Sequence, residues 1–267
     1  METPRVIFYY QTFRTLQPIL TKNSPVSHIH LSSIHFGIDS NLQPYIHLND
    51  NSPYDEKNNS VWEELEQAKK LGIKIVLMVG GAGTAYQDLF SNFDIYYNML
   101  YHLFKNKPVL TGIDLDIEEE VDIENIKMLI RKLKQDFPED DFTISTAPIQ
   151  SSLQSDVPGM GGFVYKNLLE SPEGKYISYF NGQFYSDYSK TAYDEVIQNG
   201  YKPEMVVMGM LSGTDFEEEL QKIVNEYGYK IGGVFVWEYF NSNPLQWLEI
   251  IKKVFYKEYL LNYCNIS

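Results

Sequence analysis

The sequence predicts a single α/β domain over residues 1–267, folded as a (β/α)8 TIM barrel without an inserted domain. Eight short runs rich in β-branched and aromatic residues recur along the chain, and most precede a segment with the apolar periodicity of an amphipathic helix. The length of 267 residues lies in the range in which α/β barrels occur as one unit. A doubly wound open sheet is the alternative, because periodicity does not show whether a sheet closes.

The expected strands are short, and several are almost continuously apolar. Residues 75–79 read Ile-Val-Leu-Met-Val, and residues 205–210 read Met-Val-Val-Met-Gly-Met. Parallel strands that are covered by helices on the outside are apolar in this way. The expected strands cover residues 5–10, 28–37, 74–80, 112–118, 143–147, 177–185, 204–211 and 232–238.

The segments between these strands carry helix signals. Residues 126–137, 216–227 and 247–255 place apolar side chains at the three- and four-residue spacing of one helix face. Ser60 and Thr214 each stand three residues before a glutamate, which is the capping-box pattern of a helix start. Strand and helix signals therefore alternate along the chain, as a (β/α)8 barrel requires.

Two irregular stretches, residues 41–59 and 151–162, each follow an expected strand. Loops that follow the strands of a barrel lie on its C-terminal face, where binding sites form, so we expect both stretches to border a site. Only about 20 residues separate the last two expected strands, too few for an inserted domain. The site should therefore be shallow and open.

Charge and cysteine content restrict the partners. A net charge of −14 argues against nucleic acid or an anionic membrane as the main partner, because phosphate binding needs clustered Lys and Arg. Cys264 is the only cysteine, so it is expected to be an incidental thiol, with neither an intrachain disulfide nor a thiol-based metal cluster. With no visible signal peptide, the single cysteine favours an intracellular or non-classically released protein. We expect a monomer.

Residues 111–118, Thr-Gly-Ile-Asp-Leu-Asp-Ile-Glu, are the most informative stretch. Side chains of a strand alternate between its faces, so Asp114, Asp116 and Glu118 point to one side. Three carboxylates inside a barrel repel one another unless they share protons or bind a cation, and a shared proton raises a carboxyl pKa. The stretch therefore predicts an acid–base site. A divalent-cation site and a solvated acidic strand end, continued by residues 119–122, are the alternatives.

The stretch also resembles the fourth-strand signature of glycoside hydrolase family 18, the chitinases and related endo-β-N-acetylglucosaminidases, which is usually Asp-Gly-x-Asp-x-Asp-x-Glu. Four further stretches resemble family segments in the same order, so the resemblance covers nearly the whole chain. They are residues 74–81, like a third strand ending in Ser-x-Gly-Gly; Ala147-Pro148, like the end of strand five; residues 182–185, like the Gln-x-Tyr element; and residues 232–239, like strand eight with its terminal tryptophan.

The resemblance implies a retaining glycosidase that cleaves beside N-acetylglucosamine in chitin or a related oligosaccharide and needs no metal or other cofactor. Glu118 would protonate the glycosidic oxygen, while the substrate's own acetamido oxygen would act as the nucleophile. Asp116 would orient the acetamido group, Asp114 would share a proton with Asp116, and Tyr185 would donate a hydrogen bond to the acetamido carbonyl. The substrate-binding residues implied are Trp237, Gln183, Tyr9, Phe36, Gly81 and Ala147.

Several of these residues also have structural interpretations. Trp237 is a large apolar residue on an expected core strand, and the glycines at 80–81 would suit a simple turn. His28 and His30 have the alternate spacing of a ligand pair, but no acidic or thiol partner is near them in sequence. We therefore interpret both as histidines at the start of a strand.

The sequence departs from the family pattern at two positions. Thr111 stands at the first acidic position of the signature, and Met78 stands where the family has a serine before Gly-Gly. In the family both positions support the site from behind, so a weakened hydrogen-bond network behind Asp114 is expected.

A chitinase is the function that the sequence favours. The alternatives are an endo-β-N-acetylglucosaminidase acting on N-glycans, a non-catalytic chitin- or glycan-binding barrel, and a metal-dependent hydrolase built on the acidic strand. The presence of Glu118 argues against a non-catalytic barrel, because such proteins usually lack that glutamate.

Overall fold

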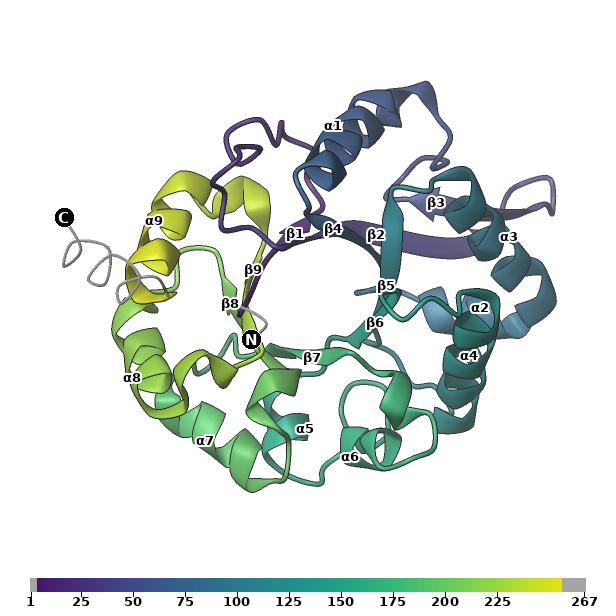
Figure 1. Cartoon of the computed structure of the whole chain (residues 1–267). Coiled ribbons are helices and arrows are strands. Elements are labelled where there is room, and N and C mark those ends of the chain that lie inside the picture. The colour runs from purple at the N-terminus through teal and green to yellow at the C-terminus, as the bar shows by residue number, and fades with distance from the viewer. Residues whose placement is uncertain (1–3, 256–267) are drawn as a thin grey trace.

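The computed structural model describes residues 4–255, which form a closed barrel of eight parallel strands with helices around it (Figure 1). Strand β1 pairs with both β2 and β9, and this double pairing closes the ring. The predicted fold class is confirmed, whereas Cys264 lies outside the described residues. The barrel strands are β1 (Arg5–Tyr10), β2 (His28–Ile38), β4 (Lys74–Gly80), β5 (Leu110–Asp116), β6 (Thr143–Thr146), β7 (Tyr179–Gln183), β8 (Val206–Leu211) and β9 (Gly233–Trp237).

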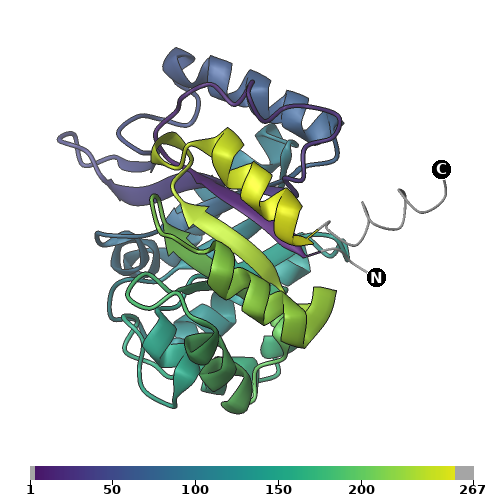
Figure 2. The ribbon, with the colours of Figure 1, turned by 90° about the vertical axis from the view of Figure 1, so that its left-hand side faces the viewer.

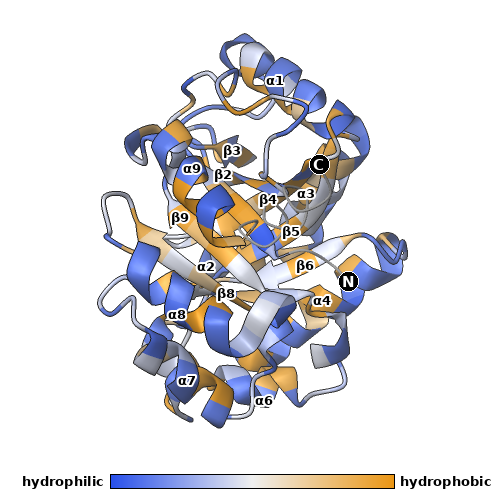
Figure 3. Ribbon diagram, turned by 60° about the vertical axis from the view of Figure 1, so that its left-hand side comes forward, coloured by the Kyte–Doolittle hydropathy of each residue, from blue (hydrophilic) through white to orange (hydrophobic). Residues whose placement is uncertain are grey.

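Helices surround the barrel (Figures 1 and 2), and their buried apolar side chains share one core with the outward side chains of the strands. Coloured by hydropathy, the strands are largely hydrophobic, while hydrophilic residues dominate the outer faces of the helices (Figure 3). None of the helices within residues 4–255 has the length and apolar character needed to span a bilayer. The helices are α1 (Asn59–Lys70), α2 (Ala85–Ser91), α3 (Phe93–Asn106), α4 (Ile123–Asp136), α5 (Gln150–Gln154), α6 (Tyr165–Leu169), α7 (Lys190–Gln198), α8 (Glu217–Tyr227) and α9 (Pro244–Phe255).

Strand β5 shows how the barrel places polar groups inside. Its outward side chains Ile113 and Leu115, with Ile117 just beyond the strand, are at most 1% exposed and belong to the main apolar core. The alternate residues Asp114 and Asp116 therefore face the barrel interior, as predicted. Packing of the outer face holds this strand in place while its inner face carries charge.

Residues 41–59 are more ordered than predicted. They contain β3 (Pro44–Leu48), which pairs antiparallel with the end of β2 from Ile34 to Ile38. The β2 strand continues past the point where it pairs with β4, and β3 provides partners for its otherwise unpaired backbone groups. No inserted domain separates β8 from β9, where residues 212–232 form α8 and its connections.

The two predicted capping boxes are wrong. Helix α1 is preceded directly by a short 3-10 helix, and Asp55 already accepts a hydrogen bond from the N–H of Lys57. The helical turns thus begin before Ser60 is reached. Helix α8 begins only at Glu217, with Phe216 at its N-cap and no side-chain capping bond, so Thr214 stands outside it.

Strand β2 shifts register between Leu31 and Ile34 where it pairs with β4. The outward residues Leu31 and Ile34 are three positions apart instead of two, and both are 0% exposed in the main core. Alternation along β2 is therefore reset. His30 points inward before the shift, whereas Ser33 and His35 face the barrel mouth after it.

Replacing Leu115 with Ala tests the outward packing of β5. Leu115 is 0% exposed, so the free energy of unfolding should fall by about 2–5 kcal/mol in urea denaturation. Leu42→Ala is the matched control, because Leu42 is 80% exposed and its loss should change stability by no more than about 0.5 kcal/mol. Similar losses in the two variants would contradict the assigned packing.

Candidate active site

The three acidic side chains of the predicted ladder lie at increasing depth in the C-terminal mouth of the barrel. Asp114 is 0% exposed, Asp116 is 5% exposed, and Glu118 is partly exposed just beyond the end of β5. The side-chain amide of Gln183 on β7 lies 3.3 Å from Oδ1 of Asp116 and 3.3 Å from Oε1 of Glu118. The two outer carboxyl groups therefore share one donor and belong to one site.

Asp114 is surrounded by hydrogen-bond donors from other strands. The Tyr9 hydroxyl donates to Oδ2 at 2.7 Å, the Ser145 hydroxyl donates to Oδ1 at 2.6 Å, and the Asn181 amide donates to Oδ1 at 3.0 Å. Nδ1 of His30 lies 3.3 Å from Oδ2. Burial alone would raise the pKa of Asp114, but the His30 imidazole and the bonds from Ser145 and Tyr9 together lower it. Asp114 is therefore the ionised member of the ladder.

The pKa of Asp116 is shifted in the opposite direction. Burial raises its pKa well above the ordinary value, and the negative charges of Glu118 and Asp114 raise it further. Gln183 is its one side-chain donor among residues 4–255. The middle carboxyl group thus carries a proton beside ionised Asp114, which relieves the repulsion between these two buried groups.

A cleft of about 360 Å³ opens above the ladder at the C-terminal ends of the strands. Binding and catalytic sites of (β/α)8 barrels lie on this face. Predicted site residues on β5, β7 and β9 meet here, together with residues that were not predicted. The lining consists of Gln11, Ser33, His35, Met78, Gly80, Gly81, Ala82, Asp116, Glu118, Gln183, Tyr185, Leu211 and Trp237.

Two aromatic side chains form much of the cleft wall. Burial raises the pKa of Tyr185 well above its ordinary value, and the charges of Asp116 and Glu118 add to this, so its hydroxyl stays protonated and can donate a hydrogen bond. Trp237, the last residue of β9, is partly exposed to the cleft, with its ring centroid 5.4 Å from that of Tyr9. The cleft thus combines an apolar surface with a hydroxyl donor.

Gly81 and Ala147 act through their backbones. The N–H of Gly81 donates to the carbonyl of Asp116 at 2.9 Å, and its φ of +83° is strained for any residue with a Cβ. A Cβ there would also lie 3.0 Å from Cε of Met78. The carbonyl of Ala147 accepts a hydrogen bond from Gln183 at 2.9 Å, so Ala147 orients that amide, while its own side chain is buried.

Phe36 does not line the cleft, which corrects the sequence-based assignment. It is 3% exposed in the outer core, with its ring 5.5 Å from that of Tyr96 on α3. The register shift in β2 turns Phe36 toward the helices and brings His35 to the cleft instead. The sequence carries no visible signal for this shift.

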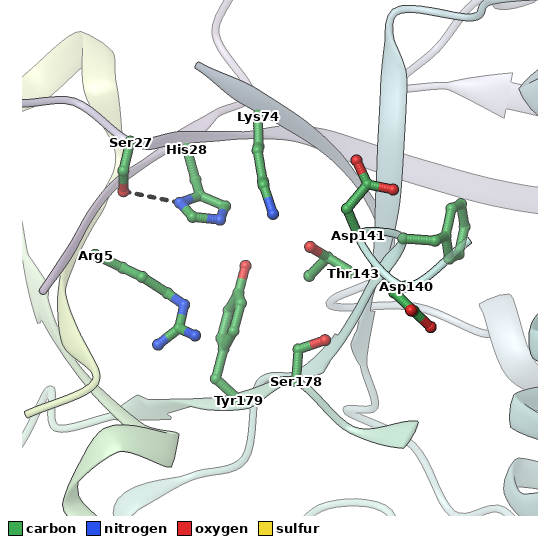
Figure 4. Close-up of a pocket in the computed structure, with 10 residues that line it drawn as sticks. Arg5, Ser27, His28, Lys74, Asp140, Asp141, Thr143, Ser178 and Tyr179 are labelled. Carbon is green, nitrogen blue, oxygen red and sulfur yellow. Dashed lines mark hydrogen bonds between the residues drawn. The ribbon is translucent and has the colours of Figure 1, made fainter. Parts of the chain in front are cut away.

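A second hollow, of about 440 Å³, opens at the opposite, N-terminal mouth of the barrel. Arg5, His28, Lys74 and Tyr179 point into it (Figure 4). The acidic ladder opens toward the other end, so we do not assign the chemistry to this hollow. Among the described residues no group of three or more His, Cys, Asp or Glu side chains is arranged to hold a metal ion.

Comparison with known proteins identifies the family. A fungal endo-β-N-acetylglucosaminidase of glycosyl hydrolase family 18 is 31% identical to this chain, with a TM-score of 0.84 over 95% of this chain and 98% of the other. The chain belongs to glycoside hydrolase family 18. A chitinase from Aspergillus fumigatus is also 31% identical, with a TM-score of 0.81 over 93% and 98% of the two chains.

A family 18 chitinase from Pseudoalteromonas aurantia shares the fold at 20% identity, with a TM-score of 0.72 over 94% of this chain and 99% of the other. Neither a family model nor a curated protein matches the sequence.

The two departures from the family pattern do not leave Asp114 unsupported. The Thr111 hydroxyl bonds to the backbone of Ile75 at 3.2 Å and does not reach Asp114. Met78 is 1% exposed and packs in the apolar interior beside Tyr9. The donors that surround Asp114 come from β1, β6 and β7, with His30 beside it on β2, so the expected weakness behind this carboxylate is absent.

The two aspartates should affect stability with opposite dependence on pH. The raised folded-state pKa of Asp116 makes its ionisation oppose folding as the pH rises above about 4. Asp116→Asn should therefore gain stability relative to the parent as the pH increases. The lowered pKa of Asp114 stabilises the folded state above about pH 4, so Asp114→Asn should lose stability there and recover in acid.

Urea denaturation of the parent and both variants from about pH 3 to about pH 8 measures this difference in sign. Curves for the two variants that move in the same direction relative to the parent would contradict the assignment of the proton to Asp116.

Proposed function

We propose that the protein is a retaining glycosidase that cleaves the β-1,4 bond next to N-acetylglucosamine by substrate-assisted catalysis, and that its substrate is chitin. One observation carries the proposal. A partly exposed carboxyl group, Glu118, stands beside a protonated buried one, Asp116, in a cleft walled by Tyr185 and Trp237. Family membership supports the same chemistry, because family 18 is an exception to the two-carboxylate scheme of other glycosidases.

In the first step the carbonyl oxygen of the substrate's acetamido group attacks the anomeric carbon from within the same sugar. Glu118 gives its proton to the glycosidic oxygen as the bond to the leaving sugar breaks. The product of this step is a cyclic oxazolinium ion that carries a positive charge. Glu118 suits this role because it lies at the cleft, while Asp114 is completely buried.

Asp116 and Asp114 stabilise the positive charge that develops on the acetamido group. Asp116 lines the cleft and holds a proton next to ionised Asp114, so it can orient the acetamido nitrogen and then stabilise the positive ion. A buried negative charge that is already held by fixed donors needs little rearrangement when the positive charge appears.

Tyr185 and Trp237 hold the reacting sugar. The protonated Tyr185 hydroxyl would donate a hydrogen bond to the acetamido carbonyl as that oxygen becomes a nucleophile. Trp237 would form the apolar floor beneath the sugar, with Tyr9 packed against it. The amide of Gln183 would hold the carboxyl groups of Asp116 and Glu118 in position relative to each other.

In the second step water attacks the anomeric carbon, and the carboxylate of Glu118 takes a proton from that water. The oxazolinium ring opens, the acetamido group is restored, and Glu118 is again protonated. Two successive displacements at one carbon retain its configuration.

The openness of the cleft supports chitin as the substrate. No inserted domain stands between β8 and β9, so a long polymer can lie across the mouth. An endo-β-N-acetylglucosaminidase acting on N-glycans is the second candidate, and the fungal enzyme with a TM-score of 0.84 favours it. Both substrates carry the acetamido group that the mechanism needs.

Product analysis separates the two substrates. We expect cleavage of a chitooligosaccharide at a higher kcat/KM than release of glycan from a high-mannose glycopeptide. The converse ratio, measured by mass spectrometry under the same conditions, would assign the protein to N-glycans and refute the chitinase assignment.

Glu118→Gln should lower kcat on a chitooligosaccharide by at least about a hundredfold while binding persists, because Gln keeps the shape but cannot give a proton. Glu120→Gln is the matched control, since Glu120 is an exposed glutamate two residues further on. Hydrolysis and equilibrium binding are measured for both variants. Equal activity in Glu118→Gln and the control would remove Glu118 from the mechanism.

Two rival functions predict other results for the parent protein. A non-catalytic glycan-binding barrel would bind chitooligosaccharides without hydrolysing them or an N-glycan. A metal-dependent hydrolase would lose its activity after treatment with EDTA, whereas the proposed mechanism predicts full activity.

A further inference from the structure

His30 is a buried histidine in contact with the acidic ladder. It is 0% exposed on the inner face of β2, and Nδ1 lies 3.3 Å from Oδ2 of Asp114. Nδ1 forms no hydrogen bond among the described residues, so its approach to Asp114 is a charge contact at hydrogen-bond range. Nε2 lies 3.1 Å from the hydroxyl oxygen of Tyr179 on β7. The imidazole thus bridges two strands and ends at the deepest carboxylate.

The contact with Tyr179 is compatible with a proton on Nδ1 of His30. Burial, followed by the charge of Asp114, raises the pKa of Tyr179, so its hydroxyl stays protonated and can donate to Nε2. A neutral imidazole that accepts at Nε2 carries its proton on Nδ1. That N–H then faces Asp114. The Tyr9 ring, with its centroid 4.8 Å from that of the imidazole, restricts its movement.

We propose that His30 is a positioning residue for the glycosidase reaction, which holds Asp114 ionised and aligned through Nδ1 and thereby keeps the shared proton of the ladder on Asp116. The inference rests on the proposed function. It assigns to His30 the supporting role that Thr111 and Met78 do not fill in this chain.

The surroundings of Asp114 explain why one more donor matters. Its two oxygens already accept bonds from Tyr9, Ser145 and Asn181, but none of these groups titrates in the range where carboxylates do. Among residues 4–255, His30 is the one basic side chain in contact with Asp114.

The neighbouring carboxyl groups of the ladder oppose the ionisation of Asp114. Asp116 is the next acidic residue on β5, and Glu118 follows it at the cleft. Without His30 the pKa of Asp114 should rise, because burial would be opposed by fewer favourable contacts. The shared proton could then move to Asp114, away from the acetamido group that Asp116 has to orient.

His28 provides a matched control two residues earlier on β2. Its side chain also faces the barrel interior, but it points into the hollow at the N-terminal mouth, near Lys74 and Arg5 (Figure 4). Nδ1 of His28 lies 2.8 Å from the Ser27 hydroxyl, and burial lowers its pKa, with the charges of Arg5 and Lys74 acting in the same direction. His28 does not reach Asp114.

The experiment compares His30→Leu, His30→Asn and His28→Leu by the pH dependence of kcat on a chitooligosaccharide. His30→Leu should lower kcat by about tenfold or more and move the acid limb of the profile to higher pH, because Asp114 would protonate more easily. Asn has an amide nitrogen near the position of Nδ1, so His30→Asn should recover much of the rate and the acid limb of the parent. His28→Leu should leave that limb unchanged.

A second measurement does not depend on turnover. The change in unfolding stability caused by His30→Leu is measured by urea denaturation at neutral pH, alone and with Asp114→Asn present. The two effects should be strongly non-additive for His30 and close to additive for His28→Leu.

The outcomes separate the two proposals. A parent without glycosidase activity would refute the proposed function, and additive stability effects at His30 and Asp114 would refute the positioning role whether or not the parent is active. In an active parent, an unchanged acid limb in His30→Leu, or equal losses in His30→Leu and His30→Asn, would also refute it.

Discussion

The repulsion among three carboxyl groups on one strand inside a closed barrel is the constraint on which the site depends. The structure meets it differently at each depth. Asp114 is charged and surrounded by donors, Asp116 carries the proton, and Glu118 reaches the open cleft. The three groups come from one short segment, but they differ in burial and in protonation. Each can therefore play a different chemical part.

The barrel makes this gradient possible because the outer and inner faces of each strand have different surroundings. The outer face of β5 packs Ile113 and Leu115 against the helical layer, and its inner face meets side chains from β1, β2, β6 and β7. A single strand in an open sheet would have partners only on its two adjacent strands. Closure brings Tyr9, from the other side of the ring, within 2.7 Å of Asp114.

Local patterns in the sequence were sufficient to predict the ladder and the barrel, because strand alternation and helix periodicity depend on neighbouring residues. Tyr185, Gln183 and Trp237 were found through the order of family-like segments, and all three line the cleft. The partners of Asp114 could not be found in this way, since Ser145 and Asn181 become its neighbours only through the register of the adjoining strands β6 and β7. Phe36 was misplaced for a related reason, because a shift within β2 reverses its face.

Whether the acetamido oxygen is the nucleophile is decided by the anomer of the product that is released first. A defined chitooligosaccharide is followed by NMR from the first turnovers, before the new reducing end equilibrates in solution. A β product, which retains the configuration of the bond that was cleaved, is the result expected from attack by the substrate's own acetamido group. An initial α product would mean direct displacement by water and would contradict the roles assigned to Asp116 and Tyr185.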